Sequence, residues 1–231
     1  MNDNKQKAHY LGHRKRLRDR FLKAGFSGMA EHEVVELLLT LPIPRRDVKE
    51  IAKDLLARFG SLRGILDASV DELKVIPGVG AVTPVALRII RESANLYLQQ
   101  ELEKSDSLIS EEAMYRFWRL RIGGLQDEVF EAAYLDSRYR LLKEGVQRLE
   151  EGTKDRAVIY PRKVMEVALK KGATAIIVAH NHPNGDIKPS DQDKTLTKAL
   201  DLAATTVQIK LHDHLIVSAD SVFSFRKAGL L

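Results

Sequence analysis

The chain has 231 residues and a net charge of +5, and 44% of its residues are hydrophobic, which favours one large or two small globular domains with a real core. It contains no cysteine, so disulfides and thiolate metal sites are excluded, and any metal ion must be bound by histidine, aspartate or glutamate. No apolar run approaches the roughly 20 residues of a membrane helix, and the N-terminus lacks the apolar core of a secretory signal, so we expect a soluble, cytoplasmic protein with no membrane partner.

Residues 1–23 are strongly basic, with only Asp3 and Asp19 as acidic residues. The basic residues of this segment are Lys5, Lys7, Arg14, Lys15, Arg16, Arg18, Arg20 and Lys23. A helix is predicted to begin within 14–21. Two interpretations fit the charge pattern: an arm that contacts the phosphates of DNA, or a solvated helix face.

Two helices are predicted next. The segment Glu31–Leu39 has helical spacing of its apolar residues and acidic residues in its first turn, and two prolines soon after it end the helix. The second helix is predicted over Val48–Phe59, with Asp47 as its cap and Gly60 as its stop.

A helix over Val70–Val75, the turn Ile76–Gly80 and a helix over Val82–Leu96 together resemble a helix-hairpin-helix module. The glycines of such a turn let the backbone approach a phosphate closely, and the next helix offers its free N–H groups to the anion. That binding would read the DNA backbone rather than the bases. The alternative is a compact helical hairpin used only for packing or protein contacts, because Val82–Pro84 offers no cation where DNA-binding versions often do.

Residues 99–110 are polar and charged, and we expect a domain boundary there, giving a helical domain over 1–103 and a second domain over 104–231. The second domain is predicted to begin with an amphipathic helix at Ser110, with Met114, Phe117 and Trp118 among its core residues. Strands and helices then follow in the order β-β-β-α-β-α-β-β, which is typical of an α/β sheet with packed helices. The expected ranges are 128–135, 141–149, 157–160, 161–171, 175–182, a helix from 190, 207–218 and 222–225.

The apolar, β-branched run from Ala175 reads as a buried strand that ends in His180-x-His182. Side chains two apart on a strand point to the same face, so both imidazoles can aim at one point. After a Pro- and Gly-rich loop, Ser190 can cap a helix that has Asp193 in its first turn. Two histidines and a carboxylate make three ligands with one position left for water, the pattern of a catalytic zinc (Zn2+) site.

The His-x-His-Pro sequence followed by Pro-Ser-x-x-Asp, with ten residues between His182 and Asp193, resembles the JAMM motif of MPN-type metallohydrolases. The whole string resembles the RadC family in particular, although Asn184 stands where that family commonly has serine. The resemblance implies a cytidine-deaminase-like MPN/JAMM sheet preceded by a small all-α helix-hairpin-helix domain. The traditional label of the family is DNA repair.

The resemblance also implies roles for individual residues: His180, His182 and Asp193 as zinc ligands, and Ser190 as a donor to the oxyanion in addition to its capping role. The general base of the family lies at the start of the first strand, in a pattern like Glu-x-Phe followed by Leu-Asp. Glu128 matches that position, with Glu131 and Asp127 as alternatives. The expected reaction is metal-dependent hydrolysis of a peptide or isopeptide-like carbonyl.

A second His-x-His, formed by His212 and His214, lacks a following Ser-x-x-Asp. We expect Asp213 and His214 to be core residues or to support the site. Two other functions are weighed against the hydrolase: a DNA-binding module whose metal site is structural or non-catalytic, and a metal-dependent nuclease. The nuclease is disfavoured because such sites cluster carboxylates around two Mg²⁺ ions.

Overall fold

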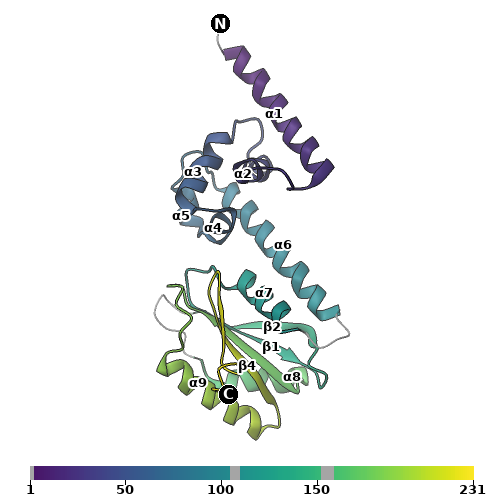
Figure 1. The fold of residues 1–231 in the computed structure, drawn as a ribbon, viewed down its shortest axis with the longest axis vertical. Coiled ribbons are helices and arrows are strands. Elements are labelled where there is room, and N and C mark those ends of the chain that lie inside the picture. The colour runs from purple at the N-terminus through teal and green to yellow at the C-terminus, as the bar shows by residue number, and fades with distance from the viewer. Residues whose placement is uncertain (1–2, 105–109, 152–158) are drawn as a thin grey trace. The chain divides into compact units, whose positions relative to one another are not determined.

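The computed structural model describes residues 3–104, 110–151 and 159–231. The chain forms two compact units, 1–93 and 94–231, and helix α6 (Val82–Lys104) contributes to both (Figure 1). The boundary predicted between 103 and 104 lies at the C-terminal end of that helix. In the described part of the chain, no helix is both long and apolar enough to cross a membrane.

The N-terminal unit is all-helical. Its helices are α1 (Asp3–Ala24), α2 (Glu31–Leu39), α3 (Lys49–Phe59), α4 (Leu62–Asp67), α5 (Val70–Lys74) and the first part of α6. Helix α2 has the predicted bounds, and α3 begins one residue later than predicted. The Asp47 carboxylate accepts a hydrogen bond from the Lys49 amide at 3.0 Å, and Gly60 ends α3 with φ = 78°. The side chains of Lys5 and Lys7 lie outside the described ones.

The turn between α5 and α6 depends on Gly78, which has φ = 90°. A Cβ atom at this position would lie 2.8 Å from Cδ1 of Ile51, so the Ile51 side chain would have to shift, and the positive φ itself favours glycine. Ile76 and Val79 on either side are buried in the apolar core of this unit. Helix α5, the glycine turn and helix α6 follow one another in the predicted order, and the resemblance to a helix-hairpin-helix module and its binding of DNA stay predictions.

The C-terminal unit is a five-stranded sheet in the order β2-β1-β3-β4-β5. Its strands are β1 (Val129–Leu135), β2 (Leu141–Glu151), β3 (Ala175–Asn181), β4 (Lys210–Val217) and β5 (Val222–Ser224). Among the strands in the described part of the chain, β3 and β4 alone pair in parallel, and helix α9 (Asp191–Thr206) connects them. Of the strand predicted over 157–160, residues 157–158 lie outside the described residues and 159–160 are not strand.

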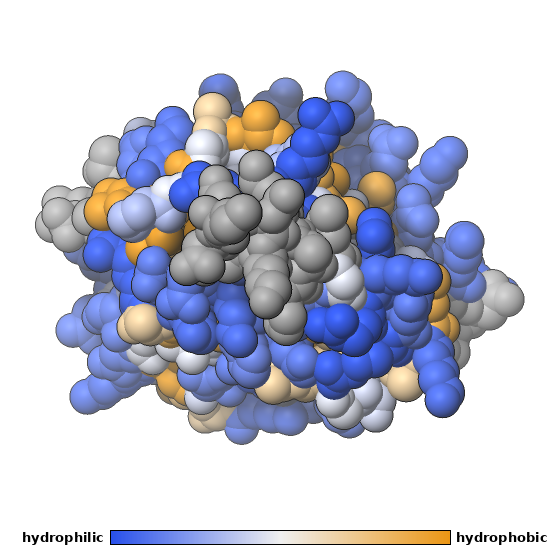
Figure 2. All heavy atoms as spheres, turned by 90° about the horizontal axis from the view of Figure 1, so that it is seen from above, coloured by the Kyte–Doolittle hydropathy of each residue, from blue (hydrophilic) through white to orange (hydrophobic). Residues whose placement is uncertain are grey.

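Helices cover both faces of this sheet (Figure 1). Helix α8 (Pro161–Lys171) and α9 pack on one face, against alternate residues such as Ile176 and Val178 of β3. Helix α7 (Glu111–Arg121) packs on the other face with Phe117 and Trp118, against Ile177. Successive side chains of β3 point to opposite faces of the sheet, and both faces are buried. The strand therefore reads as a continuous apolar run in the sequence. The surface seen in Figure 2 is mostly hydrophilic, with hydrophobic residues in small separate groups.

Candidate metal centre

The candidate ligands come from the end of β3 and the start of α9. His180 is 1% exposed. It pairs with Phe130 of β1, so its side chain points to the same face of the sheet as Phe130, the face that α8 and α9 cover. His182 lies two residues further along, just beyond the strand, and Asp193 is the third residue of α9. Strand periodicity and a helix N-terminus thus bring the three side chains to one place.

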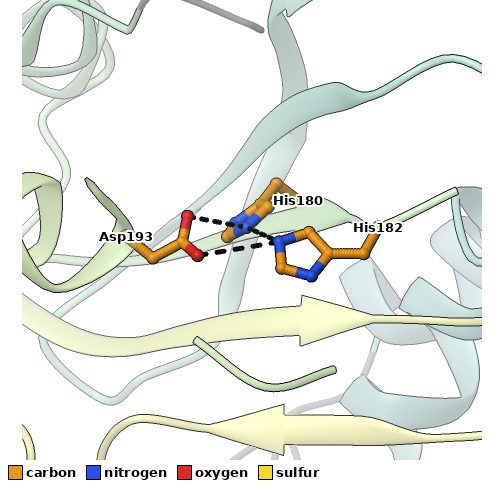
Figure 3. A group of neighbouring side chains, drawn as sticks. All are labelled: His180, His182 and Asp193. Atoms are coloured by element: carbon orange, nitrogen blue, oxygen red, sulfur yellow. Dashed lines mark hydrogen bonds and ion pairs between the residues drawn. The ribbon is translucent and has the colours of Figure 1, made fainter. Parts of the chain in front are cut away.

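The three side chains point toward one another (Figure 3), and one ligand atom from each lies within 4.8 Å of the others. Nε2 of His180 lies 3.1 Å from Nε2 of His182 and 3.1 Å from Oδ1 of Asp193. Two nitrogens bound tetrahedrally to zinc at about 2.0–2.1 Å stand roughly 3.3 Å apart. The donor types and their spacing therefore fit a divalent metal ion such as zinc.

Hydrogen bonds fix how His182 and Asp193 face the site. The carbonyl oxygen of Asp186 can only accept, so Nδ1 of His182, 2.5 Å away, must donate its proton to it, and in the neutral ring the lone pair then lies on Nε2. One carboxylate oxygen of Asp193 accepts from both the backbone nitrogen and the hydroxyl of Ser190, at 2.7 and 2.6 Å. The predicted capping of α9 by Ser190 is present, and its bond from the Asp193 amide completes a capping box.

The pKa values of Asp193 and His182 shift in opposite directions because the two side chains interact. Burial alone would raise the pKa of Asp193, but hydrogen bonds from His180 and His182 outweigh it and hold the pKa well below its usual range. The hydrogen bond to Asp193 in turn raises the pKa of His182, with a smaller contribution from the negative charge of Glu128. A cluster that stabilises an ionised carboxylate beside two imidazole nitrogens suits a bound cation.

Glu128 precedes β1 and is half-buried. Because β1 and β3 are antiparallel and Phe130 pairs with His180, residue 128 lies at the level of His182, and its charge acts on that imidazole. Glu131 points to the opposite face of the sheet, where it is fully buried and forms ion pairs with Arg121 and Arg148. The geometry therefore favours Glu128 over Glu131 as the group that serves the site.

Asn181 and Thr197 contact the site but were not predicted from the sequence, and His214 was predicted only as a core or supporting residue. Asn181, between the two histidines, is fully buried and bonds to the segment that carries Glu128. Thr197 lies four residues after Asp193, on the same helix face, a spacing that could have revealed it. His214 contacts His180, whereas Asp213 points to the other face and bonds to Ser224.

Comparison with known proteins finds a matching family for each half of the chain. Residues 108–230 match the RadC-like JAB domain, and residues 9–85 match a domain described as UPF0758 N-terminal. A UPF0758 protein of Paraburkholderia xenovorans is 38% identical over 212 residues, which are 92% of this chain and 83% of the relative. A UPF0758 protein of Paraburkholderia phytofirmans is 40% identical over 92% of this chain and 81% of its own length. A third, from Burkholderia cenocepacia, is 38% identical over 94% of this chain and 83% of its own length.

Proposed function

This chain belongs to the RadC-like JAB domain family, and from that premise we propose that its C-terminal unit is a zinc-dependent hydrolase of JAMM type that cleaves an amide or isopeptide-like bond. One observation carries the proposal: the Nε2 atoms of His180 and His182 and the carboxylate of Asp193 converge, with Glu128 at the level of His182. A structural zinc site is usually closed by four protein ligands. Among the described residues, only three ligands gather here.

A zinc ion at this position would polarise the substrate carbonyl and lower the pKa of a water in the open position. The chain supplies the proton transfers. Glu128 would take a proton from the attacking water and deliver it to the departing amine, the role of a general base and then a general acid. Ser190 is exposed, and its hydroxyl, which donates to Asp193 in the free protein, would turn to donate to a substrate oxygen on which negative charge develops.

Access to the site agrees with a substrate that arrives from one side. The His180 side chain is 2% exposed, whereas those of His182 and Asp193 are 18% and 12% exposed. The buried imidazole anchors the centre, and the partly exposed pair forms its open side. A carbonyl group of a peptide segment would therefore approach from the side of His182 and Asp193.

The test is a screen of peptides and isopeptide-linked peptides with wild type and Glu128→Gln. Glu128→Gln keeps the shape but not the base, so hydrolysis should fall by about 10²- to 10⁴-fold while the zinc content stays the same. Asp127→Asn is the matched control, because Asp127 is exposed and adjacent, and it should keep its activity. Wild-type activity that is unchanged by Glu128→Gln would reject this assignment of the base.

A second candidate function, DNA binding by the N-terminal unit, is favoured by the surface of α1. Lys15, Arg16, Arg18 and Lys23 are exposed on it. Arg20, by contrast, is engaged by Glu33 at 2.6 Å. Exposed cations on one helix can contact successive phosphates, and such binding loses affinity steeply with salt. This would suit a DNA-repair role, either beside hydrolysis or with a non-catalytic metal site.

This candidate is separated from the first by a binding measurement. Salt-dependent binding of duplex DNA that persists in Glu128→Gln but is lost when Arg16 and Arg18 are changed to glutamine would support it. If no peptide is hydrolysed in the same preparations, the metal site would be non-catalytic. Binding that is insensitive to salt, or to these two substitutions, would reject the phosphate-contacting surface.

A further inference from the structure

Three hydrogen bonds in a row connect one candidate ligand to another behind the metal centre. Nδ1 of His180 lies 2.9 Å from Nε2 of His214, on the side of the imidazole that faces away from the site. Nδ1 of His214 lies 2.7 Å from the hydroxyl oxygen of Thr197. That hydroxyl lies 2.6 Å from the backbone carbonyl oxygen of Asp193. The series therefore begins at one ligand and ends on the backbone of another.

The direction of every proton in this series follows from its last member. A carbonyl oxygen only accepts, so the single hydroxyl proton of Thr197 is donated to Asp193. The hydroxyl oxygen must then accept from His214, which places the proton of that ring on Nδ1. Nε2 of His214 is left as an acceptor and takes the proton on Nδ1 of His180. In the neutral His180 ring the lone pair therefore lies on Nε2 and faces the site, as in a metal ligand.

The opposite direction would block the site. If Thr197 donated to His214, that ring would carry its proton on Nε2 and give it to His180. His180 would then hold its own proton on Nε2, pointing at His182 and Asp193 where a metal ion should bind. The helical bond from Thr197 back to the carbonyl of Asp193 is thus what selects the binding-competent form.

The surroundings of His214 hold its ring in one orientation. Its side chain is fully buried, stacked on Phe225 at 4.7 Å between ring centroids and 10° between planes, with Phe130 against its edge. Apolar rings on these sides offer no other hydrogen-bond partner and disfavour a charged imidazole. His214 can therefore serve only as the neutral link between Thr197 and His180.

We propose that Thr197 and His214 are positioning residues that fix the tautomer of His180 and so prepare it as a metal ligand. The inference rests on the proposed metal centre and goes beyond it, because neither residue is one of the three candidate ligands. Partners of the outer nitrogen of a ligand histidine usually change metal affinity by 10- to 100-fold when they are removed. Here the outer partner is a second histidine rather than a carboxylate, so its own tautomer has to be set by a third group.

The experiment compares zinc affinity in Thr197→Val and Thr197→Ser, measured by titration of the metal-free proteins with Zn²⁺ against a competing chelator. Valine has the shape of threonine without the hydroxyl, and serine keeps the hydroxyl. We expect valine to weaken zinc binding by about 10- to 100-fold and serine to stay within about threefold of wild type. Equal affinity of all three proteins would overturn the proposal.

A measurement on the wild type makes the test independent of how the variants fold. Histidine ¹⁵N chemical shifts of the metal-free protein at neutral pH report which ring nitrogen carries the proton. We expect His180 and His214 each to carry a proton on Nδ1, whether or not Asp193 also draws a proton onto Nε2 of His180; a neutral His214 ring protonated on Nε2 would overturn the proposal. If the wild type bound no zinc at all, the proposed function would fail as well, whereas equal affinity of wild type and Thr197→Val would reject only the positioning role.

Discussion

The side-chain oxygen of Asn181 accepts a hydrogen bond from the backbone amide of Val129 at 2.8 Å. The amide group of the same side chain donates to the carbonyl oxygens of Leu125 and Asp127, each at 3.1 Å. Asn181 is fully buried between the two candidate histidine ligands. One side chain of β3 therefore fixes the backbone on both sides of Glu128, while its two neighbours in the chain belong to the candidate metal centre.

Asn181→Ala should separate catalysis from metal binding. The change leaves the Val129 amide without its partner inside the protein, which costs about 1–3 kcal/mol of unfolding free energy. We expect urea unfolding to show that loss, and hydrolysis to fall because Glu128 is no longer held, while the zinc content is retained. The matched control is Gln126→Ala, an exposed residue of the same segment, which should change neither quantity. An Asn181→Ala protein with wild-type stability and activity would show that these hydrogen bonds do not position the base.

Substitutions of Ser190 can divide its two predicted roles. The hydroxyl accepts from the Asp193 amide at 3.1 Å and donates to its carboxylate at 2.6 Å. Ser190→Ala should lower stability by about 1 kcal/mol through loss of the cap, whereas Ser190→Gly, a favoured cap residue without a side chain, should cost only about a few tenths of a kcal/mol. If the hydroxyl also stabilises the oxyanion, both variants should lose about 10²- to 10³-fold in rate. Full activity of Ser190→Gly would limit the serine to capping.

Stability in mild acid should depend on His212, outside the metal centre. Burial lowers its pKa from the ordinary 6.5 to about 4, with help from the positive charges of Arg226 and Lys210. Between these pH values the unfolded chain binds more protons than the folded one, so stability falls as the pH falls from 6.5 to 4. In His212→Gln this decline should be smaller by about 1–3 kcal/mol, at about 1.4 kcal/mol per pKa unit. Urea unfolding of the metal-free proteins at several pH values measures it, and parallel curves for the two proteins would contradict the prediction.

Local sequence signals were sufficient to predict features that depend on the residues of a single helix or strand. Pro161 at the first position of α8 and Gly172, in the left-handed conformation after its end, give that helix its predicted bounds. Likewise, strand periodicity and a capping pattern are enough to place His180, His182 and Asp193 together. Residues 99–104 belong to the polar segment in which a domain boundary was expected, and they extend α6 because they are mostly strong helix formers.

The supporting contacts depend on pairing between distant segments, which no local pattern encodes. The parallel pairing of β3 with β4 shifts by one residue after Ile176, so that His214 pairs with Val178. Without this bulge His214 would pair with Ala179 and lie on the opposite face of the sheet, away from His180. The choice between Glu128 and Glu131 depends in the same way on which face of β1 meets the histidines.

The zinc content of purified Asp193→Ala, measured by elemental analysis beside the wild type, tests the central claim most directly. The account predicts one zinc ion per wild-type chain and a large loss in the variant, because the carboxylate is one of only three ligands that gather among the described residues. Asp191→Ala is the matched control: its carboxylate lies in the same helical turn, is 98% exposed and pairs with Lys194, so zinc should be retained. Full stoichiometric zinc in Asp193→Ala would contradict the account.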